Sequence, residues 1–309
     1  MPNLSNMSDL SRAADSSAVR ILLTGGQGKT SSRIAQLASR RGHIVRTAGR
    51  RAPENPVERS EHVAFDWNDP STYAPALSGM DAVYLVAPPG MHPETLMIPF
   101  IRQAMELSVR RFVLLSSASV SETDPVFGPV HRYLRENAPE WAVLRPSYFM
   151  QNFSEASHAA TIRQSGQILT ATGSGKVGFV DAEDIAAVGL EALGRPEPFN
   201  EDLIITGPRS MSYGEAAEII GRIGGREIRH AGITEDELRN ALVAAGVPEE
   251  YAAFLAHLDT RIRTEGLEDR VTDTVLRVTG KEPRSLETFV RDNRSAFAAA
   301  DAPQPAGKE

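Results

Sequence analysis

The sequence predicts an α/β protein with a doubly wound parallel sheet, followed by a smaller, mainly helical C-terminal region. Two observations support this fold class. Short apolar runs alternate with longer helix-like stretches over the first half of the chain, whereas after residue 200 apolar residues recur at helical spacing. The segments between the apolar runs are long enough to serve as the crossovers that parallel strands require.

Six short apolar runs are the expected strands of this sheet. Each is too short for a helix, and most end in Gly, Pro, Ser or Asp. Near-continuous hydrophobicity without alternation is typical of strands that helices cover on both faces. The runs are RILLTGG (20–26), HIVRTAG (43–49), HVAFDW (62–67), AVYLVAPP (82–89), RFVLLSS (111–117) and WAVLRPS (141–147).

The region after residue 200 carries helix boundary signals. Ser212 with Glu215 and Thr234 with Glu237 match the capping box, in which a hydroxyl and a carboxylate satisfy the free amides of a helix start. Glycines stand where helices are expected to end, at Gly224, Gly246, Gly266 and Gly280. Because open parallel sheets bind ligands at the carboxyl ends of their strands, we expect these helices to shape a substrate pocket.

The chain is accordingly divided into a sheet domain and a substrate-binding region. We expect residues 18–155 to form the sheet domain, with 178–192 returning to it, and residues 156–177 and 193–300 to form the substrate-binding region. Residues 1–17 are rich in Ser, Asn and Asp, and we expect them and residues 301–309 to be disordered tails.

Composition narrows the functional classes. The 309 residues include 41% hydrophobic and 24% charged residues, close to globular averages, and 33 basic against 40 acidic side chains give a net charge of -7. No basic surface is indicated for nucleic acid or anionic lipid, so a small-molecule substrate is the expected partner, for a monomer or homodimer. The absence of cysteine excludes disulfides and a thiol nucleophile, and no His or carboxylate cluster has metal-ligand spacing.

No targeting or membrane segment is expected. The sequence has no run of about 18 apolar residues, and MPNLSNMSDLSRAADSSAV lacks a basic segment followed by an apolar one. We therefore expect a cytoplasmic location and no membrane partner.

A glycine-rich turn follows the first expected strand and opens into a helix, in ILLTGGQGKTSSRIAQLASRRG. Gly25 can make the tight turn, Gly28 lets the backbone approach a pyrophosphate, and the helix start supplies oriented amides. The third small position is Ser31 instead of Gly. A triphosphate-binding Walker A loop is excluded by spacing, because it needs a glycine where Leu23 stands. The turn predicts a dinucleotide site.

The residues that follow the second expected strand indicate which dinucleotide. About 20 residues beyond such a turn, NAD-binding proteins place an acid that holds the ribose hydroxyls. Arg50 and Arg51 stand there instead. A guanidinium at this place favours a 2′-phosphate through a charge-assisted contact, so NADP(H) is the expected cofactor. The alternative is that both arginines are merely solvated.

Five segments together resemble the NmrA-like branch of the atypical short-chain dehydrogenases: TGGQGKTSSRIA, FDWNDPSTY, AVYLVAPP, LRPSYFMQNF and FVDAEDIAAV. Within that branch the sequence most resembles the ergot-alkaloid reductases of the festuclavine and agroclavine dehydrogenase type and their bacterial relatives. The resemblance spans about residues 19–297. It implies a Rossmann domain that binds NADPH and the reduction of an imine, an iminium ion or a similarly activated acceptor, as in secondary metabolism and alkaloid biosynthesis.

The resemblance also implies places for individual residues. Arg50 would bind the adenosine 2′-phosphate. The residues near the phosphates would be Gly25, Gly28, Lys29 and Thr30. The adenine would lie beside Asp66 and Trp67. The residues near the nicotinamide ribose would be Ala87, Pro88, Pro89, Ser116 and Ser117.

A Tyr-x-x-x-Lys pair, which supplies the proton in typical short-chain dehydrogenases, is missing where it is expected. Tyr133 lies 16 residues after Ser117, but Asn137 takes the place of the lysine and cannot lower the phenol pKa. An iminium acceptor tolerates that loss, because hydride addition yields a neutral amine. A ketone would need a donor for the developing alkoxide.

Other candidates for chemistry are Tyr148, Ser117 and His131, with Tyr133 as a weak hydrogen-bond donor. Phe149 and Phe153, with Met150, are expected to form the wall of an apolar substrate pocket. Asp181 is expected to cap the helix that follows it, with Asp184 tying loops together.

Three functions remain open. The first is an NADPH-dependent reductase of a small apolar or heteroaromatic metabolite. The second is a non-catalytic dinucleotide-binding regulator, because NmrA-like proteins include nucleotide sensors. The third is a cyclase or isomerase that uses the same fold without redox chemistry.

Overall fold

The computed structural model describes residues 18–155 and 158–298, which form two compact units. The first unit comprises the chain up to Ser116, Val120–Leu144 and Ala186–Leu203. The second comprises Ser117–Ser119, Arg145–Ile185 and the chain from Ile204 onward. Residues 117–119, 145–155 and 178–185 thus group with the second unit and residues 193–203 with the first, unlike the expected division. The two tails, 1–17 and 301–309, lie outside the described residues.

The first unit is built on a seven-stranded sheet with the order β3-β2-β1-β4-β5-β6-β9. All six predicted strands are present, and the pairs β3-β2, β2-β1, β1-β4, β4-β5 and β5-β6 are parallel. This order is the doubly wound arrangement of the Rossmann fold, which confirms the predicted fold class. The strands are β1 (Arg20–Thr24), β2 (Ile44–Gly49), β3 (Ser60–Ala64), β4 (Ala82–Val86), β5 (Arg111–Leu115), β6 (Glu140–Pro146) and β9 (Glu201–Ile205).

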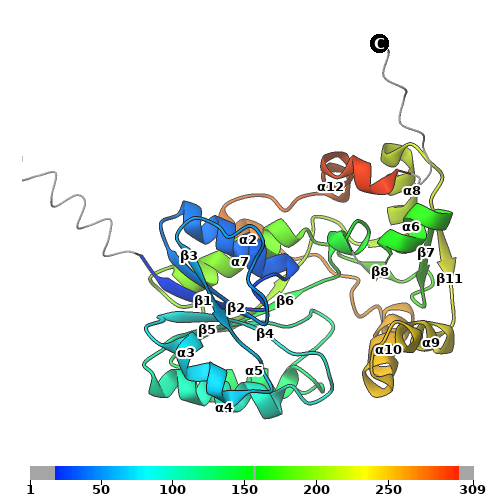
Figure 1. The fold of residues 1–309 in the computed structure, drawn as a ribbon. Helices are drawn as coiled ribbons and strands as arrows, with labels where there is room; N and C mark the ends of the chain where they lie inside the picture. The colour runs from blue at the N-terminus through cyan, green and yellow to red at the C-terminus, as the bar shows by residue number, and fades with distance from the viewer. Residues whose placement is uncertain (1–17, 156–157, 299–309) are drawn as a thin grey trace, which may run out of the picture. The chain divides into compact units, whose positions relative to one another are not determined.

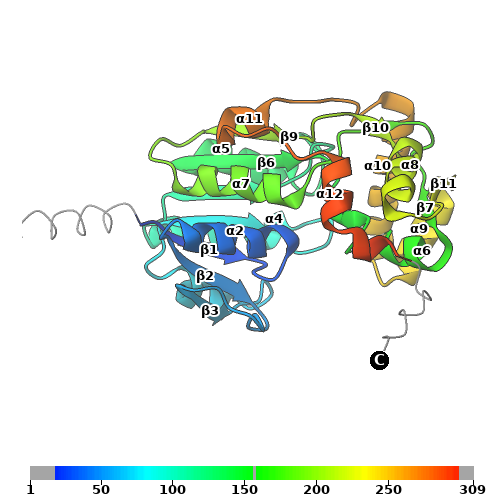
Figure 2. The ribbon, with the colours of Figure 1, turned by 90° about the horizontal axis from the view of Figure 1, so that it is seen from above.

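Helices cover both faces of this sheet, as Figure 1 shows: α2 and α7 lie on one face and α3, α4 and α5 on the other. The view from above in Figure 2 shows α2 and α7 running along the sheet. The helices are α2 (Lys29–Arg40), α3 (Tyr73–Leu77), preceded by the short helix η1 (Pro70–Thr72), α4 (Glu94–Glu106), α5 (Gly128–Asn137) and α7 (Ala182–Gly194).

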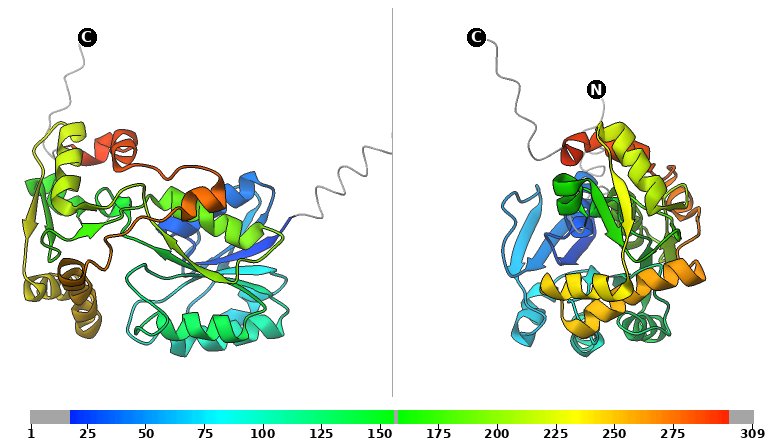
Figure 3. Two further views of the ribbon diagram at one scale, coloured as in Figure 1. Left: turned by 180° about the vertical axis from the view of Figure 1, so that it is seen from behind. Right: turned by 90° about the vertical axis from the view of Figure 1, so that its right-hand side faces the viewer.

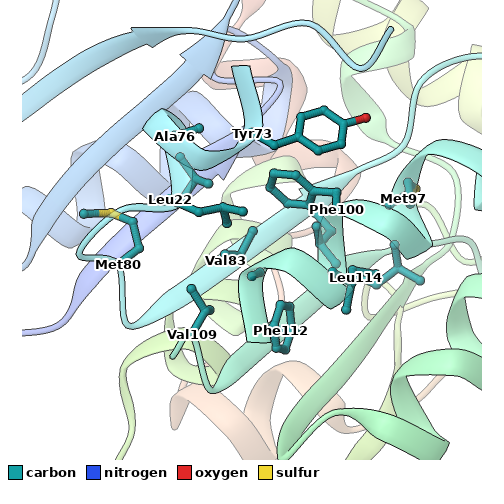
Figure 4. Close-up of a cluster of buried hydrophobic side chains, with 14 of the residues drawn as sticks. Leu22, Tyr73, Ala76, Met80, Val83, Met97, Phe100, Val109, Phe112 and Leu114 are labelled. Carbon is teal, nitrogen blue, oxygen red and sulfur yellow. The ribbon is translucent and has the colours of Figure 1, made fainter. Parts of the chain in front are cut away.

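The core between the sheet and helices α3 to α5 buries one face of the strands. Leu22, Val83 and Phe112 from three adjacent strands are fully buried. They pack with Tyr73 and Phe100 from the helices, in the cluster drawn in Figure 4. Burial of such side chains contributes about 1.5 to 3 kcal/mol each, which stabilises the sheet on which the site is built.

The second unit is mainly helical, as predicted, but it also contains two short sheets that the sequence did not indicate. β7 pairs with β11 in parallel, and β8 pairs with β10 antiparallel. Figure 3 shows α9 and α10 packed side by side, with β11 leading into α9. Its elements are η2 (Met150–Asn152), α6 (Ala159–Ser165), β7 (Gln167–Thr170), β8 (Lys176–Val177), β10 (Met211–Ser212), α8 (Tyr213–Gly224), β11 (Arg229–Gly232), α9 (Glu235–Ala244), α10 (Glu249–Glu265), α11 (Thr274–Thr279), α12 (Leu286–Asp292) and η3 (Arg294–Phe297).

The helix boundary signals of this unit are confirmed in atomic detail. Reciprocal capping boxes join Ser212 to Glu215 and Thr234 to Glu237. The left-handed residue after α8 is Gly225, one position beyond the predicted Gly224, whereas Gly266 and Gly280 end their helices as predicted. In the part of the chain that the structure describes, no helix combines the length and hydrophobicity needed to cross a membrane.

Candidate cofactor site

The glycine-rich turn joins β1 to α2 and needs its glycines for two different reasons. Gly25 has a φ of 63°, a left-handed conformation that glycine adopts at little cost. Gly26 lies against β2, where a Cβ atom would stand only 2.7 Å from the Cβ of Thr47. The N–H of Gly28 donates to the carbonyl of Gly25 at 2.7 Å and closes the turn. The backbone at the start of α2 is thereby held in a fixed direction.

The side chains beneath this turn anchor α2 to the sheet. The hydroxyl of Ser31 donates to the carbonyl of Thr24 at 3.1 Å, which accounts for serine at the third small position. The phenol of Tyr84 donates to the hydroxyl of Thr30 at 3.0 Å, and burial raises the pKa of that phenol. The Thr30 side chain is therefore buried and hydrogen-bonded in the interior beneath the turn.

The start of α2 has the electrostatic character of an anion site. Gly28 contributes no side-chain cap, and no acidic residue stands in the first turn. The partial positive charge of the helix N-terminus is therefore not neutralised by a carboxylate of its own first turn. The geometry fits a pyrophosphate.

A groove of about 1120 Å³ extends from this turn along the first unit, large enough for a dinucleotide. Eight of the predicted cofactor residues line it, whereas Lys29, Thr30 and Ser116 do not. The eight are Gly25, Gly28, Arg50, Asp66, Trp67, Ala87, Pro88 and Pro89. Further lining residues that the sequence did not single out include Gly26, Gln27, Thr47 and His62.

The arginine end of the groove lies after β2. Gln27 holds the backbone there, since its side-chain amide donates to the carbonyls of Arg51 and Ala52 at 2.8 and 3.0 Å. Arg50 and Arg51 are exposed, and neither guanidinium has a hydrogen-bond or ion-pair partner among residues 18–155 and 158–298. Two unpaired cations in a groove fit an anionic group of a ligand.

The loop after β3 forms one wall of the groove. The Asp66 carboxylate accepts the N–H of Asn68 at 2.9 Å, which fixes a tight turn at the strand end. The half-buried Trp67 packs its ring edge-on against Phe65 and Phe100, with centroids 4.9 and 5.1 Å away. Trp67 is thus tied to the core and also borders the groove.

Residues at the ends of β4 and β5 divide between groove and core. Ala87 and Pro88 are half-buried and Pro89 is exposed in the groove lining. Ser116 is 8% exposed, and its N–H donates to the carbonyl of Leu144 at 2.8 Å. Its observed role is to extend the pairing of β5 with β6.

Two candidate catalytic residues lie on α5. Tyr133 is half-buried and packs against the core cluster, and the side-chain amide of Asn137 donates to its carbonyl at 2.9 Å. Asn137 is thus engaged with the helix backbone, which agrees with the missing Tyr-x-x-x-Lys pair. His131 is 5% exposed beside the ring of Trp141, with centroids 5.9 Å apart. This packing is that of an interior residue.

The other candidates belong to the second unit. The Ser117 hydroxyl accepts the N–H of Ser119 at 3.2 Å, and the Tyr148 phenol donates to the carboxylate of Asp259 at 3.3 Å. Phe149 is half-buried and forms a single bridge with Val180. Phe153 is fully buried among the rings of Phe179, Tyr213 and His158, so in this structure it supports the unit from its core.

Two buried acids of the second unit, Asp259 and Glu268, were not predicted from the sequence. Burial raises the pKa of Asp259 to about 6, although the Ala171 N–H donates to this carboxylate at 3.1 Å. Burial also raises the pKa of Glu268, which accepts hydrogen bonds from Ser119 and Ser147. Asp259 could have been found, because it continues the buried helical spacing of Ala252, Ala256 and Ile262. No sequence pattern marks Glu268.

The acids at the start of α7 are placed as predicted. Asp181 precedes the helix, and its carboxylate accepts the N–H of Glu183 at 3.0 Å. The side-chain amide of Gln151 donates to the same oxygen at 2.7 Å. Asp184 accepts the N–H of Arg284 at 2.7 Å and so ties α7 to the segment before α12.

The sheet order, the glycine turn and the groove define a Rossmann-type dinucleotide-binding protein. Comparisons agree. A family model described as NAD(P)H-binding matches residues 25–196. The chain is 47% identical to the uncharacterized oxidoreductase YesF of Bacillus subtilis over 87% of its length and 93% of the relative. It is 38% identical to agroclavine dehydrogenase of Claviceps fusiformis over 91% of its length and 99% of the relative.

A solved structure shares the fold. The triphenylmethane reductase of a Citrobacter species, complexed with NADP(H), superposes with a TM-score of 0.68 at 20% identity, covering 89% of this chain and 99% of that one. The chain belongs to the NAD(P)H-binding family, and its relatives include the agroclavine and festuclavine dehydrogenases. It is an NAD(P)H-dependent oxidoreductase, as the resemblance in its sequence implied.

Proposed function

We propose that the protein is an NADPH-dependent reductase that acts in secondary metabolism. Its acceptor is an imine, an iminium ion or a similarly activated group in a small apolar or heteroaromatic metabolite. The choice of cofactor rests on Arg50 and Arg51 in the groove beside the glycine turn, neither of which has a side-chain partner within the part of the chain that the structure describes. When bound, NADPH supplies the hydride.

Each part of the groove has a role in this proposal. The backbone of Gly25, Gly28 and the first turn of α2 holds the pyrophosphate, with Lys29 adding charge nearby. Arg50 binds the 2′-phosphate. Asp66 and Trp67 border the adenine, and the segment Ala87–Pro89 borders the nicotinamide ribose. Tyr148 and Phe149, which do not line this groove, are the candidates for contact with the acceptor.

The class of acceptor is inferred from the missing Tyr-x-x-x-Lys pair, which would act as the proton donor. Asn137 occupies the position of the usual lysine and is hydrogen-bonded to the backbone of Tyr133, so no ammonium group activates that phenol. A carbon that already carries positive character needs no such acid to accept hydride. The name of one relative, NAD(P)H azoreductase, supports an acceptor with a nitrogen–nitrogen double bond, and the name agroclavine dehydrogenase supports a small metabolite as the substrate.

The test is transfer of deuterium from NADPH labelled at C4. The purified protein is incubated with a panel of cyclic imines, iminium salts and azo dyes, and products are analysed by mass spectrometry. We expect deuterium in a reduced imine or iminium product. Tight NADPH binding without transfer to any acceptor would favour the regulator, and conversion of an acceptor without NADPH consumption would favour the isomerase.

A further inference from the structure

We propose that His62 is a second ligand of the 2′-phosphate of NADP(H) and makes the preference for NADPH over NADH pH-dependent. This inference rests on the proposed cofactor choice, and it concerns a residue that neither the sequence patterns nor the family resemblance singled out. It is carried by the position of the imidazole, by the hydrogen bond that engages its Nδ1, and by the charges around it.

The imidazole lies in the arginine end of the groove. His62 on β3 is paired in register with Thr47 on β2, and both residues line the groove together with Gly49, Arg50 and Arg51. Gly49 has no side chain, and a Cβ atom placed there would stand 4.0 Å from Cε1 of the imidazole. The ring therefore borders the backbone that leads directly into Arg50.

Thr47 engages one nitrogen of the ring. The Thr47 hydroxyl lies 3.3 Å from the carbonyl of Glu61 and 3.2 Å from Nδ1 of His62. Its single proton can go to either acceptor, so Nδ1 is hydrogen-bonded to Thr47 in either tautomer. Nε2 is the ring nitrogen left for a ligand, and in the imidazolium both nitrogens are donors, which is what a phosphate requires.

The charges around the ring favour an anion. Arg50 and Arg51 follow β2, and the ring has no partner other than Thr47 among the described residues. Glu61 projects to the opposite face of β3, where it pairs with Arg46 at 2.6 Å. Asp66 beyond the strand end is engaged by Asn68.

The phosphate would couple protonation to binding. A 2′-phosphate dianion beside the ring favours the protonated form of the imidazole. Binding of NADPH therefore takes up a proton on His62, and lower pH strengthens binding. The phosphate alone would do the opposite, because it becomes a monoanion near pH 6 and binds cations less strongly.

The test is calorimetric titration of NADPH and NADH between pH 8.5 and 6.5 with the wild type, His62→Gln and His257→Gln. NADH lacks the 2′-phosphate and serves as the internal reference. His257 is an exposed histidine of α10 and is a control for loss of an imidazole. We expect the ratio of NADPH to NADH affinity to rise at least about fivefold over this range in the wild type and the His257 variant. In His62→Gln it stays constant or falls.

A second measurement does not depend on any variant. The Cε1 resonance of His62 is followed by NMR against pH, with and without NADP⁺, and we expect the protonated position to persist to higher pH when NADP⁺ is bound. An unshifted titration, or an affinity ratio that changes equally in the wild type and His62→Gln, would overturn the role of His62. Equal affinity for NADPH and NADH at every pH would instead reject the proposed cofactor choice.

Discussion

The phenol of Tyr148 donates a 3.3 Å hydrogen bond to the carboxylate of Asp259, a residue that is only 7% exposed. Burial raises the pKa of Asp259 to about 6, and burial together with that neighbouring carboxylate raises the pKa of Tyr148 well above its ordinary value. The phenol therefore keeps its proton at neutral pH, and ionisation of Asp259 decides how firmly the proton is held.

Replacement of Asp259 by Asn should remove a pH-dependent component of turnover. Below pH 6 the neutral carboxyl attracts the phenolic proton less, so Tyr148 becomes a better donor to a neutral imine. We expect wild-type kcat/KM for a neutral imine to rise as the pH falls through 6, and Asp259→Asn to lose that rise. Tyr148→Phe should lose it too and fall about tenfold or more. If both variants keep the pH profile of the wild type, Tyr148 and Asp259 take no part in the proton transfer.

Tyr133 provides the contrasting case. Because Asn137 is engaged with the helix backbone and cannot activate the phenol, Tyr133→Phe should leave turnover of an iminium acceptor within about tenfold of the wild type. Steady-state kinetics with saturating NADPH measure the effect. A thousandfold loss with normal folding and cofactor binding would identify Tyr133 as the proton donor instead.

Arg50 should set cofactor choice. Arg50→Asp should remove the proposed charge-assisted contact with the 2′-phosphate, which would cost about 1.5 to 3 kcal/mol, or about ten- to a hundredfold in NADPH affinity. Affinity for NADH should change little. Arg40→Asp, at the other end of α2 and exposed, is the matched control for a charge reversal. Calorimetric titration at constant pH measures the affinities for NADPH and NADH. Equal affinities of the wild type for both dinucleotides would contradict this role of Arg50.

The sequence predicted the sheet better than the second unit because of how their residues are buried. Strands such as Ile21–Leu23 are covered on both faces, so they are apolar throughout and stand out in any window. β8 and β10 have two residues each, too few for a periodicity, and β11 is largely exposed. β9 was missed because its run EDLII begins with two acids.

The residues of the candidate site also differ in how well the sequence predicted them. Gly25, Gly28 and Arg50 belong to one local turn-and-strand pattern, so their spacing alone placed them together. Asp259 and Tyr148 are 111 residues apart, and His62 meets Thr47 only through the parallel register of β3 on β2. Contacts of this kind depend on the tertiary fold, which no short sequence window contains.

Gly26 should be as necessary as the glycines of the motif. A Cβ atom at Gly26 would stand 2.7 Å from the Cβ of Thr47, so the turn must move away from β2. We expect Gly26→Ala to lower the free energy of unfolding by about 1 to 3 kcal/mol and to weaken NADPH binding. At Gly232 a Cβ atom meets nothing within 4 Å among the described residues, so Gly232→Ala is the control. Equal stability of both variants in urea denaturation would contradict the close approach.

Asp184 should make stability depend on pH in a defined direction. Burial raises its pKa from 3.8 to about 6, in spite of its place in the first turn of α7, where the helix dipole favours a carboxylate. A carboxyl whose pKa is higher in the folded than in the unfolded state contributes most stability below the unfolded value, near 3.8. That contribution is lost as the pH rises through about 6.

Asp184→Asn should therefore stabilise the protein at neutral pH. Asparagine keeps an oxygen for the N–H of Arg284 and carries no charge to bury. We expect the variant to exceed the wild type by about 1 to 3 kcal/mol in the free energy of unfolding at pH 7.5 and to lose this advantage near pH 4. Urea denaturation at both pH values measures it, with the exposed Asp273→Asn as control. A difference that is the same at both pH values would mean that Asp184 is not ionised at a cost in the native state.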